Sequence, residues 1–237
     1  MTIEITRVQP SDKKTINAFY KLWEQVFGAE ELEPKSITVA AMNGEYPVVY
    51  RVYVAKDGNK VVGVIAGGMD YLVDDQNVLM IGYAATHKDY RKQGIQRTLF
   101  NELVKDASAD STKEGKTLSV ITSEATEMSV PVWGKLGLML IPVNYIQPAL
   151  DFDESTGLPA DGAGEAKENL MLGFLTDPSN ELISKAVEAI YRWSHRWPRE
   201  DFDSDEAYAA HVAYVDRFQR EFDALLAVAD ISFGLPH

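Results

Sequence analysis

A short basic segment near the middle of the chain has the residue types that bind anions. Arg91, Lys92 and Arg97 surround one glycine, Gly94. Guanidinium and ammonium groups bind phosphates, and a glycine lets a phosphate oxygen approach the main chain because it has no Cβ. A diphosphate is therefore the expected ligand of this segment.

The flanking residues predict how this segment is held. Residues 78–86 are expected to form a strand that leads into it. On the helix expected after the glycine, one face carries Ile95, Thr98, Leu99, Leu103 and Ala107. The first N–H groups of a helix have no partner within that helix, and the helix dipole attracts negative charge. Strand, glycine-containing turn and helix start together predict an anion site.

Residues 91–96, Arg-Lys-Gln-Gly-Ile-Gln, resemble the Arg/Gln-x-x-Gly-x-Gly/Ala signature of the GCN5-related N-acetyltransferases (GNAT). Residues 132–138, Val-Trp-Gly-Lys-Leu-Gly-Leu, are similar to that family's Leu-Tyr-x-Lys-x-Gly-Phe segment and lie at the expected distance. The resemblance covers residues 2–176. It implies the α/β (α+β) GNAT fold. This fold has a central twisted sheet of about seven strands, mixed but mostly antiparallel, with parallel strands at the cofactor cleft and flanking helices.

The resemblance also implies that acetyl-CoA is the co-substrate. The positions that correspond to the family's cofactor-binding residues are Ala84, Ala85, Thr86, Arg91, Lys92, Gln93, Gly94, Ile95, Gln96 and Arg97. The acetyl group would pass directly to an amine, with the thioester carbonyl polarised by a main-chain N–H near the end of residues 78–86. An alkylamine has a pKa of roughly 10.4, so only about one molecule in a thousand is nucleophilic at neutral pH, and a base or a desolvating, water-linked path is needed.

The sequence departs from the family pattern at three positions. Trp133 stands where many members have the tyrosine that acts as general acid, and an indole N–H does not usefully protonate a thiolate. Met80 stands where some members have a glutamate on the cofactor strand. Gln96 replaces the last Gly/Ala of the signature and narrows the space near the diphosphate.

Other residues are therefore candidates for proton transfer. Glu124 is the first candidate for the base, directly or through water, and Tyr83 and Tyr145 are candidates for the acid. His87 and Asp70 are further candidates. Structural roles explain such residues equally well: Glu124 could cap a helix, Tyr83 could belong to the core, and His87 could be a solvated turn residue.

Composition limits the remaining possibilities. The 237 residues carry a formal net charge of −13 and no cysteine, which excludes disulfides, thiolate metal sites and a cysteine nucleophile. No metal site is expected. Residues 1–150 have 16 basic and 18 acidic side chains, whereas residues 151–237 have 7 and 18. The acidic C-terminal part argues against a nucleic acid or an anionic membrane as partner; it either concentrates a cationic amine or keeps the protein in solution.

No signal peptide or membrane-spanning segment is expected either. The N-terminal residues lack the apolar core of a signal peptide, and no apolar run reaches the length that crosses a bilayer. We therefore expect a cytoplasmic protein.

Residue periodicity predicts the other elements. Expected strands are residues 2–8, 48–56, 60–73, 117–122, 138–150 and 168–176. Expected helices are one that starts at residues 9–12 and ends near Gly28, one over residues 34–42, and one that follows residues 123–127 and runs to Leu136 before Gly137. The aromatic face of the first helix fits either the core or an acceptor-side wall. Gly67 and Gly68 predict a bulge or a close approach in their strand, and residues 151–167 predict an exposed loop.

The tail predicts two further helices. One would have Asp177 as N-cap and Pro178 at its first position, and the other would start at Ser204. We expect residues 1–176 to form the acetyltransferase domain and residues 177–237 a helical extension. Core packing or a homodimer interface is favoured over a lid as the role of this extension.

Two functions are consistent with these residues. The first is an N-acetyltransferase, an acyltransferase that moves the acetyl group of acetyl-CoA to a primary amine of a small molecule or peptide. The second is a non-catalytic binding protein of the same fold that senses acyl-CoA. The enzyme is preferred, because positioning alone carries measurable transfer even where a general acid is missing.

Overall fold

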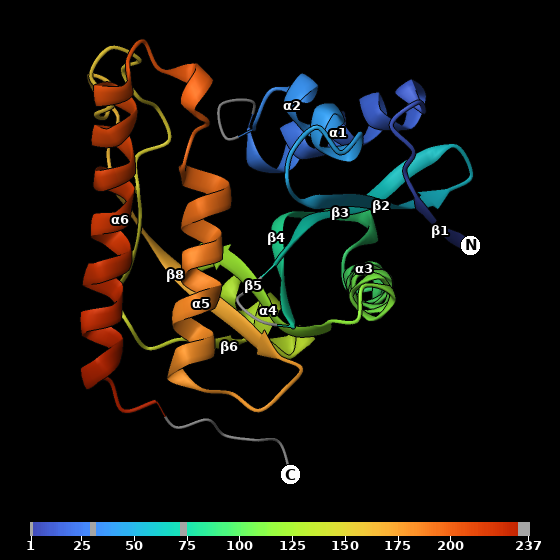
Figure 1. Ribbon diagram of the computed structural model, residues 1–237. Helices are drawn as coiled ribbons and strands as arrows, with labels where there is room; N and C mark the ends of the chain where they lie inside the picture. The colour runs from blue at the N-terminus through green and yellow to red at the C-terminus, as the bar shows by residue number, and fades with distance from the viewer. Residues whose placement is uncertain (1, 29–31, 72–74, 232–237) are drawn as a thin grey trace. The chain divides into compact units, whose positions relative to one another are not determined.

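The computed structural model describes residues 2–28, 32–71 and 75–231 (Figure 1). The chain forms two compact units. The first contains residues 1–71 and 75–118, and the second contains residues 72–74 and 119–237. The described residues form a mixed sheet of eight strands with flanking helices, which is the α/β class predicted from the sequence.

The first unit is built on an antiparallel sheet with the order β1-β2-β3-β4. Its strands are β1 (Ile3–Arg7), β2 (Val49–Asp57), β3 (Lys60–Tyr71) and β4 (Gln76–Thr86). The predicted hairpin turn at residues 57–59 joins β2 to β3, and Gly58 adopts a positive φ of 57° there. Such a turn needs a positive φ, which glycine reaches without strain.

Helices cover both faces of this sheet (Figure 1). The three helices are α1 (Lys13–Phe27), α2 (Lys35–Met42) and α3 (Ile95–Lys113). The first two lie on one face and α3 lies on the other. The aromatic stripe of α1 is core, because Phe19, Tyr20 and Trp23 are buried and their rings pack on one another at centroid distances of 4.8–5.1 Å.

The sequence predicted a bulge or a close approach at Gly67 and Gly68, and both occur where β3 pairs with β4. The register changes between Ala66, which faces Tyr83, and Gly67, which faces Ile81, so that Gly82 is an extra residue in β4. A Cβ on Gly67 would lie 2.6 Å from the carbonyl oxygen of Met80, which only glycine allows. A bulge of this kind bends its strand and changes where the following side chains point.

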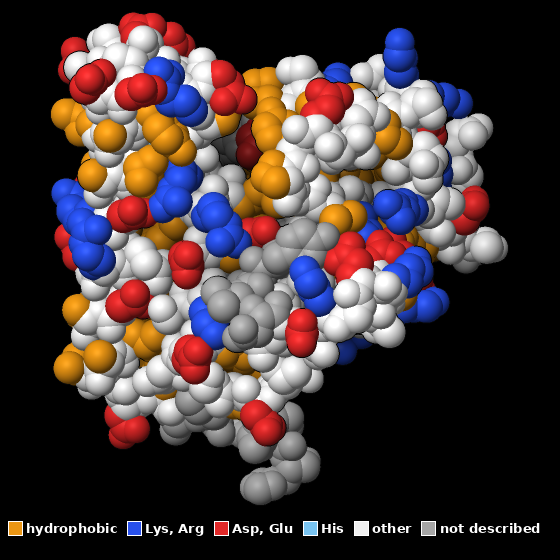
Figure 2. Space-filling view, viewed as in Figure 1, with side chains coloured by type: hydrophobic (Ala, Val, Ile, Leu, Met, Phe, Trp, Pro, Cys, Tyr) orange, Lys and Arg blue, Asp and Glu red, His pale blue; other side chains and the backbone are white. Residues whose placement is uncertain are grey.

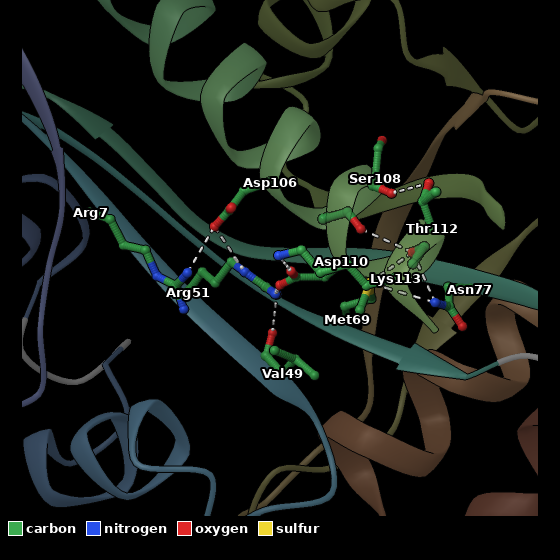
Figure 3. Close-up of polar contacts among 12 residues, drawn as sticks. Arg7, Val49, Arg51, Met69, Asn77, Asp106, Ser108, Asp110, Thr112 and Lys113 are labelled. Atoms are coloured by element: carbon green, nitrogen blue, oxygen red, sulfur yellow. Dashed lines mark hydrogen bonds and ion pairs between the residues drawn. The ribbon is translucent and has the colours of Figure 1, made fainter. Parts of the chain in front are cut away.

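A buried arginine ties α3 to β2 (Figure 3). The Arg51 side chain has no exposed surface; its Nε lies 3.1 Å from Asp106 Oδ2, and its Nη2 pairs with Asp110. Arg7 and Tyr53 donate to the same oxygen of Asp106 at 3.0 and 2.8 Å. A buried guanidinium is stable only when its partners are in place, so this network fixes α3 along the sheet.

Replacing Arg51 by Leu should lower the free energy of unfolding by about 3 kcal/mol, because the carboxylates of Asp106 and Asp110 lose their counter-charge. Denaturant unfolding measures the change. The matched control is Lys105→Ala, which removes an exposed partner of Glu102 at 3.7 Å and should cost less than about 1 kcal/mol. Equal, small losses in both variants would show that the network does not hold α3.

The second unit is built around a long strand with three antiparallel neighbours. The strands are β5 (Thr117–Ala125), which begins at the end of the first unit, β6 (Met139–Leu140), β7 (Tyr145–Gln147) and β8 (Ala166–Phe174). Strands β5, β6 and β7 all pair with β8. The helix α4 (Val130–Leu136) lies between β5 and β6 and ends at Gly137, as predicted, with a left-handed φ of 98°.

The single strand predicted for residues 138–150 is wrong, because the structure has two short strands there. The segment between β6 and β7 contains Pro142, which has no N–H to donate to a sheet ladder. Pro148 follows directly after β7. The antiparallel pairing of this segment with the last strand is confirmed for both pieces.

The chain ends in helices α5 (Asn180–Ile190) and α6 (Asp205–Val228). The predicted N-cap Asp177 is wrong: Ser179 caps α5, and its side chain accepts the N–H of Leu182 at 3.1 Å. The predicted start at Ser204 is confirmed, since its hydroxyl accepts the N–H of Ala207. Acidic side chains gather around this end of α6, where the helix dipole favours them (Figure 2).

The loop between β7 and β8 is not simply exposed, as the sequence predicted. Phe152 is buried together with Ala149, Phe202 and Ala207. Gly157 lies so close to α6 that a Cβ at this position would be 1.8 Å from the carbonyl oxygen of Ala207. The loop therefore packs on α6. Position 157 requires glycine for two reasons: a side chain would overlap α6, and the positive φ of 70° is strained for other residues.

Replacing Gly157 by Ala should destabilise the protein by about 3 kcal/mol, because the added methyl group overlaps the α6 main chain. Gly162→Ala is a matched control in the same loop. Gly162 has a similar φ of 86°, but a Cβ there would meet no atom within 4 Å, so its cost should be about 1 kcal/mol from backbone strain alone. Equal melting temperatures for the two variants would exclude the predicted contact.

Among the residues that the structure describes, no helix combines the length and apolar character needed to cross a membrane.

Candidate cofactor loop and acceptor site

The predicted anion segment lies between β4 and α3 in the first unit. A 3₁₀ turn, Lys88–Tyr90, follows β4, and Gly94 is the N-cap of α3 with φ 79° and ψ 0°. A Cβ on Gly94 would meet no atom within 4 Å, so the main chain is open at this point. Together with the unpaired N–H groups of a helix start, this open glycine is suited to an anionic ligand.

Contacts within the loop fix its shape. Arg91 Nε donates to the carbonyl oxygen of Thr86 at 3.3 Å, and Gln93 Nε2 donates to the main-chain carbonyl oxygen of Asp89 at 3.3 Å. Lys92 adopts a positive φ of 62°, a conformation that is strained for a residue with a side chain. Such strain is often found at ligand-binding turns.

The first turn of α3 is also held close to the sheet. A Cβ on Gly63 of β3 would lie 2.7 Å from Ile95 Cγ2, so the helix start packs directly over this glycine. Ile95 and Ala85 are buried, so only their main-chain atoms are available to a ligand. Gln96 is half-buried and its Oε1 accepts the hydroxyl of Thr86 at 3.1 Å.

The side chains that remain outside this packing are mainly cationic. Arg91, Lys92, Gln93 and Arg97 are exposed. Ala84 and Thr86 belong to the last part of β4, where Ala84 faces Ile65 across the ladder. The exposed cationic side chains of the loop and the amides at the start of α3 are groups that suit a diphosphate.

Tyr83, a predicted acid, lies in the first unit beside the aromatic residues of α1. Its ring contacts Trp23 at a centroid distance of 4.6 Å and Phe27 at 5.7 Å. Its hydroxyl accepts the N–H of Glu33 at 3.3 Å. This half-buried packing agrees with the structural alternative, a role in the core.

Glu124 and Tyr145 are brought together in the second unit. Tyr145 donates its phenolic proton to Glu124 Oε1 at 2.7 Å. Glu124 lies in β5 opposite Leu170 of β8, so the alternative that it caps a helix is wrong. A third group, His195, was not predicted, and its Nε2 is 3.5 Å from the same carboxylate oxygen.

These neighbours decide the protonation of the carboxylate. Burial raises the pKa of Glu124, but His195 and the hydroxyl of Tyr145 stabilise the charged form more strongly, so the pKa lies below its usual value. Burial, followed by the charge of Glu124, raises the pKa of Tyr145 well above its usual value. At neutral pH this pair is an ionised carboxylate and a phenol that retains its proton, which favours binding a cation over donating a proton.

Three other residues considered from the sequence have surroundings of their own. Trp133 is buried in α4. Asp70 is buried on β3 opposite Val78. His87 caps the 3₁₀ turn after β4, where its Nδ1 is 3.6 Å from Asp89, in agreement with a role in the turn.

The comparisons identify the class of protein. The model of the acetyltransferase (GNAT) family matches residues 16–138, more than half of the chain. The chain therefore belongs to the GNAT family, as the resemblance at residues 91–96 and 132–138 indicated. No curated protein matches it significantly.

Solved structures share the fold at low sequence identity. A GNAT-family protein from Bacteroides thetaiotaomicron has a TM-score of 0.56 and 15% identity, covering 81% of this chain and 98% of its own. An aminoglycoside 6′-N-acetyltransferase complexed with coenzyme A has a TM-score of 0.52 and 14% identity, covering 74% and 99%. A NatC complex bound to Gag peptide and CoA has a TM-score of 0.50 and 17% identity, covering 74% and 100%. At these identities the likeness concerns the fold alone.

Proposed function

We propose that the protein is an N-acetyltransferase that transfers the acetyl group of acetyl-CoA to a primary amine of a small molecule or peptide. The observation that carries the proposal is the open, left-handed Gly94 at the start of α3. Main-chain N–H groups and the side chains of Arg91 and Lys92 would bind the diphosphate of acetyl-CoA there. Membership of the acetyltransferase family and the coenzyme A in two structural neighbours support this ligand.

The reaction is a direct acyl transfer. The amine nitrogen forms a bond to the thioester carbonyl carbon, the carbon–sulfur bond breaks, and the coenzyme A thiolate leaves and takes up a proton. The amine must lose a proton before or during attack, since its ammonium form has no free electron pair. Glu124 would hold the ammonium and accept this proton directly or through water.

An acyl-CoA sensor without turnover remains the second candidate. The observation in its favour is that neither Trp133, which replaces the family's tyrosine, nor the candidate Tyr145 is suited to act as the acid. Trp133 is buried, and the pKa of Tyr145 is raised by burial and by Glu124, so its phenol is a weak acid. General acid–base terms supply only about 10²–10⁴-fold, however, and their loss leaves an enzyme that is slow but active.

A thiol-release assay separates the two functions. With acetyl-CoA and a panel of polyamines, amino acids, aminoglycosides and lysine peptides, we expect release of coenzyme A with at least one class of amine. Glu124→Gln should lower kcat/KM by about 10²-fold, because the neutral amide neither attracts an ammonium nor accepts its proton. The matched control Glu127→Gln changes an exposed glutamate just beyond β5 and should leave the rate unchanged.

Two results would count against this assignment. Tight binding of acetyl-CoA without thiol release from any amine would establish the sensor instead of the enzyme. Thiol release at the same rate in wild type and Glu124→Gln would keep the enzyme and remove Glu124 from its mechanism.

A further inference from the structure

A π-helical turn between α5 and α6 brings a second titratable group to Glu124. The turn, Tyr191–His195, directly follows α5. Its wider winding is uncommon and occurs frequently at functional sites. Both of its end residues, Tyr191 and His195, are buried, and the His195 side chain has no exposed surface.

The buried imidazole is left without a hydrogen bond. Among the described residues, neither Nδ1 nor Nε2 of His195 has a hydrogen-bond partner. The nearest charged group is Glu124, with Oε1 at 3.5 Å from Nε2, a distance that allows an electrostatic contact but is long for a hydrogen bond. A buried polar side chain without a partner is costly, so its position beside a carboxylate calls for a functional explanation.

Two stacked tyrosines, Tyr145 and Tyr191, lie beside the carboxylate of Glu124. Tyr145 and Tyr191 stack face to face, with ring centroids 5.6 Å apart and planes at 7°. Tyr191 donates its proton to the carbonyl oxygen of Ile146 at 2.9 Å, which places its ring relative to β7. The π-helical turn therefore fixes the phenol that holds Glu124, as well as supplying the histidine.

We propose that the C-terminal helical segment completes the acceptor site: Glu124 is the carboxylate that binds the cationic amine, and His195 and Tyr145 are the positioning residues that hold it ionised and oriented. This inference rests on the proposed function and specifies its acceptor as a primary amine that binds in its ammonium form. The site thus consists of β5, β7 and the turn after α5.

The geometry leaves one carboxylate oxygen for the ligand. Both contacts that the described residues make to this group fall on Oε1, from Tyr145 and His195. The side chain of Glu124 is 23% exposed, so it is not closed off from a ligand. A carboxylate that is fixed by two neighbours loses less entropy when it binds a cation than a mobile one does.

The charges near the turn have both signs: Arg192 within it pairs with Glu188, and Arg196 directly after it pairs with Asp216. Burial is the main cause that raises the pKa of Tyr191, followed by Glu124; Glu221 and Asp223 of α6 add to it. The phenol of Tyr191 is therefore neutral at neutral pH, and the residues that face Glu124 are two protonated tyrosines and one histidine.

His195→Gln tests the positioning role, because glutamine keeps a polar group of similar size but lacks the imidazole that lies beside Glu124. We expect KM for the amine to rise about tenfold, with the Kd for acetyl-CoA unchanged. The apparent pKa of Glu124, followed by ¹³C NMR of its carboxyl group, should rise, and the acid limb of the kcat/KM profile should move to higher pH with it. Tyr145→Phe should shift both in the same direction.

His211→Gln is the matched control. His211 is the other buried histidine of this unit; its Nε2 accepts the N–H of Trp197 at 2.9 Å, and its ring contacts Phe152 at 4.3 Å. Among the described residues it has no contact with Glu124, and its contact with His195 is with the main chain of that residue. This variant should lower the melting temperature while leaving the amine KM and the pKa of Glu124 as in wild type.

The outcomes separate this inference from the proposed function. An unchanged pKa of Glu124 in His195→Gln, or an amine KM that rises equally in His211→Gln, would overturn the positioning role even if the wild type is an active enzyme. If no amine releases thiol, the proposed function fails, and spermidine titrated against the Glu124 carboxyl resonance decides the inference. A shift in wild type that is lost in His195→Gln supports the cation site, and no shift overturns it.

Discussion

The first turn of α3 has N–H groups that its own helix cannot satisfy, and the position of this turn determines what the first unit can bind. Gly94 begins the helix in a left-handed conformation and leaves the main chain open. Gly63 lets Ile95 approach β3 closely. Further along the helix, Arg51 fixes α3 through Asp106 and Asp110 (Figure 3). These constraints would preorganise the proposed anion site, because its donors would need no rearrangement when the ligand arrives.

A different constraint shapes the second unit. Its sheet carries a carboxylate, Glu124, whose charge is stable in a buried environment only because Tyr145 and His195 are beside it. The helical tail supplies one of these partners and, through Tyr191, orients the other. The tail therefore contributes to the electrostatics of β5 as well as to the core. Core packing, a homodimer interface and a lid were the roles of this tail considered from the sequence, and a contact with a candidate site residue was not among them.

Local patterns carried the prediction of the first unit. The strand before Gly94, the amphipathic helix after it and the hairpin at residues 57–59 depend on residues close in sequence, and the structure confirms all three. The left-handed cap at Gly137 was predictable for the same reason. The break between β6 and β7 had a local signal in Pro142, which the alternation of apolar residues outweighed.

The parts that were missed depend on contacts between distant residues. Nothing near Gly157 in the sequence indicates that α6 packs so closely against this residue that a Cβ would overlap the helix main chain. His195 lies in a segment rich in tryptophan and arginine that reads as the end of a helix, and only the fold brings it to Glu124. Conversely, Tyr83 has a phenol that could serve as a general acid. The aromatic residues of α1 that pack on it lie far from it in sequence, so its structural role could not be predicted.

Calorimetric titration of acetyl-CoA into wild type, Gly94→Ala and Gly115→Ala tests most directly whether the start of α3 binds the diphosphate. The two glycines flank α3, have similar positive φ values of 79° and 72°, and would each place a Cβ in open space. Binding to wild type, at least tenfold weaker binding to Gly94→Ala and unchanged binding to Gly115→Ala are expected, because only the first methyl group lies where a phosphate oxygen must approach the main chain. No heat with wild type, or equal affinities for the two variants, would contradict a diphosphate site at this helix start.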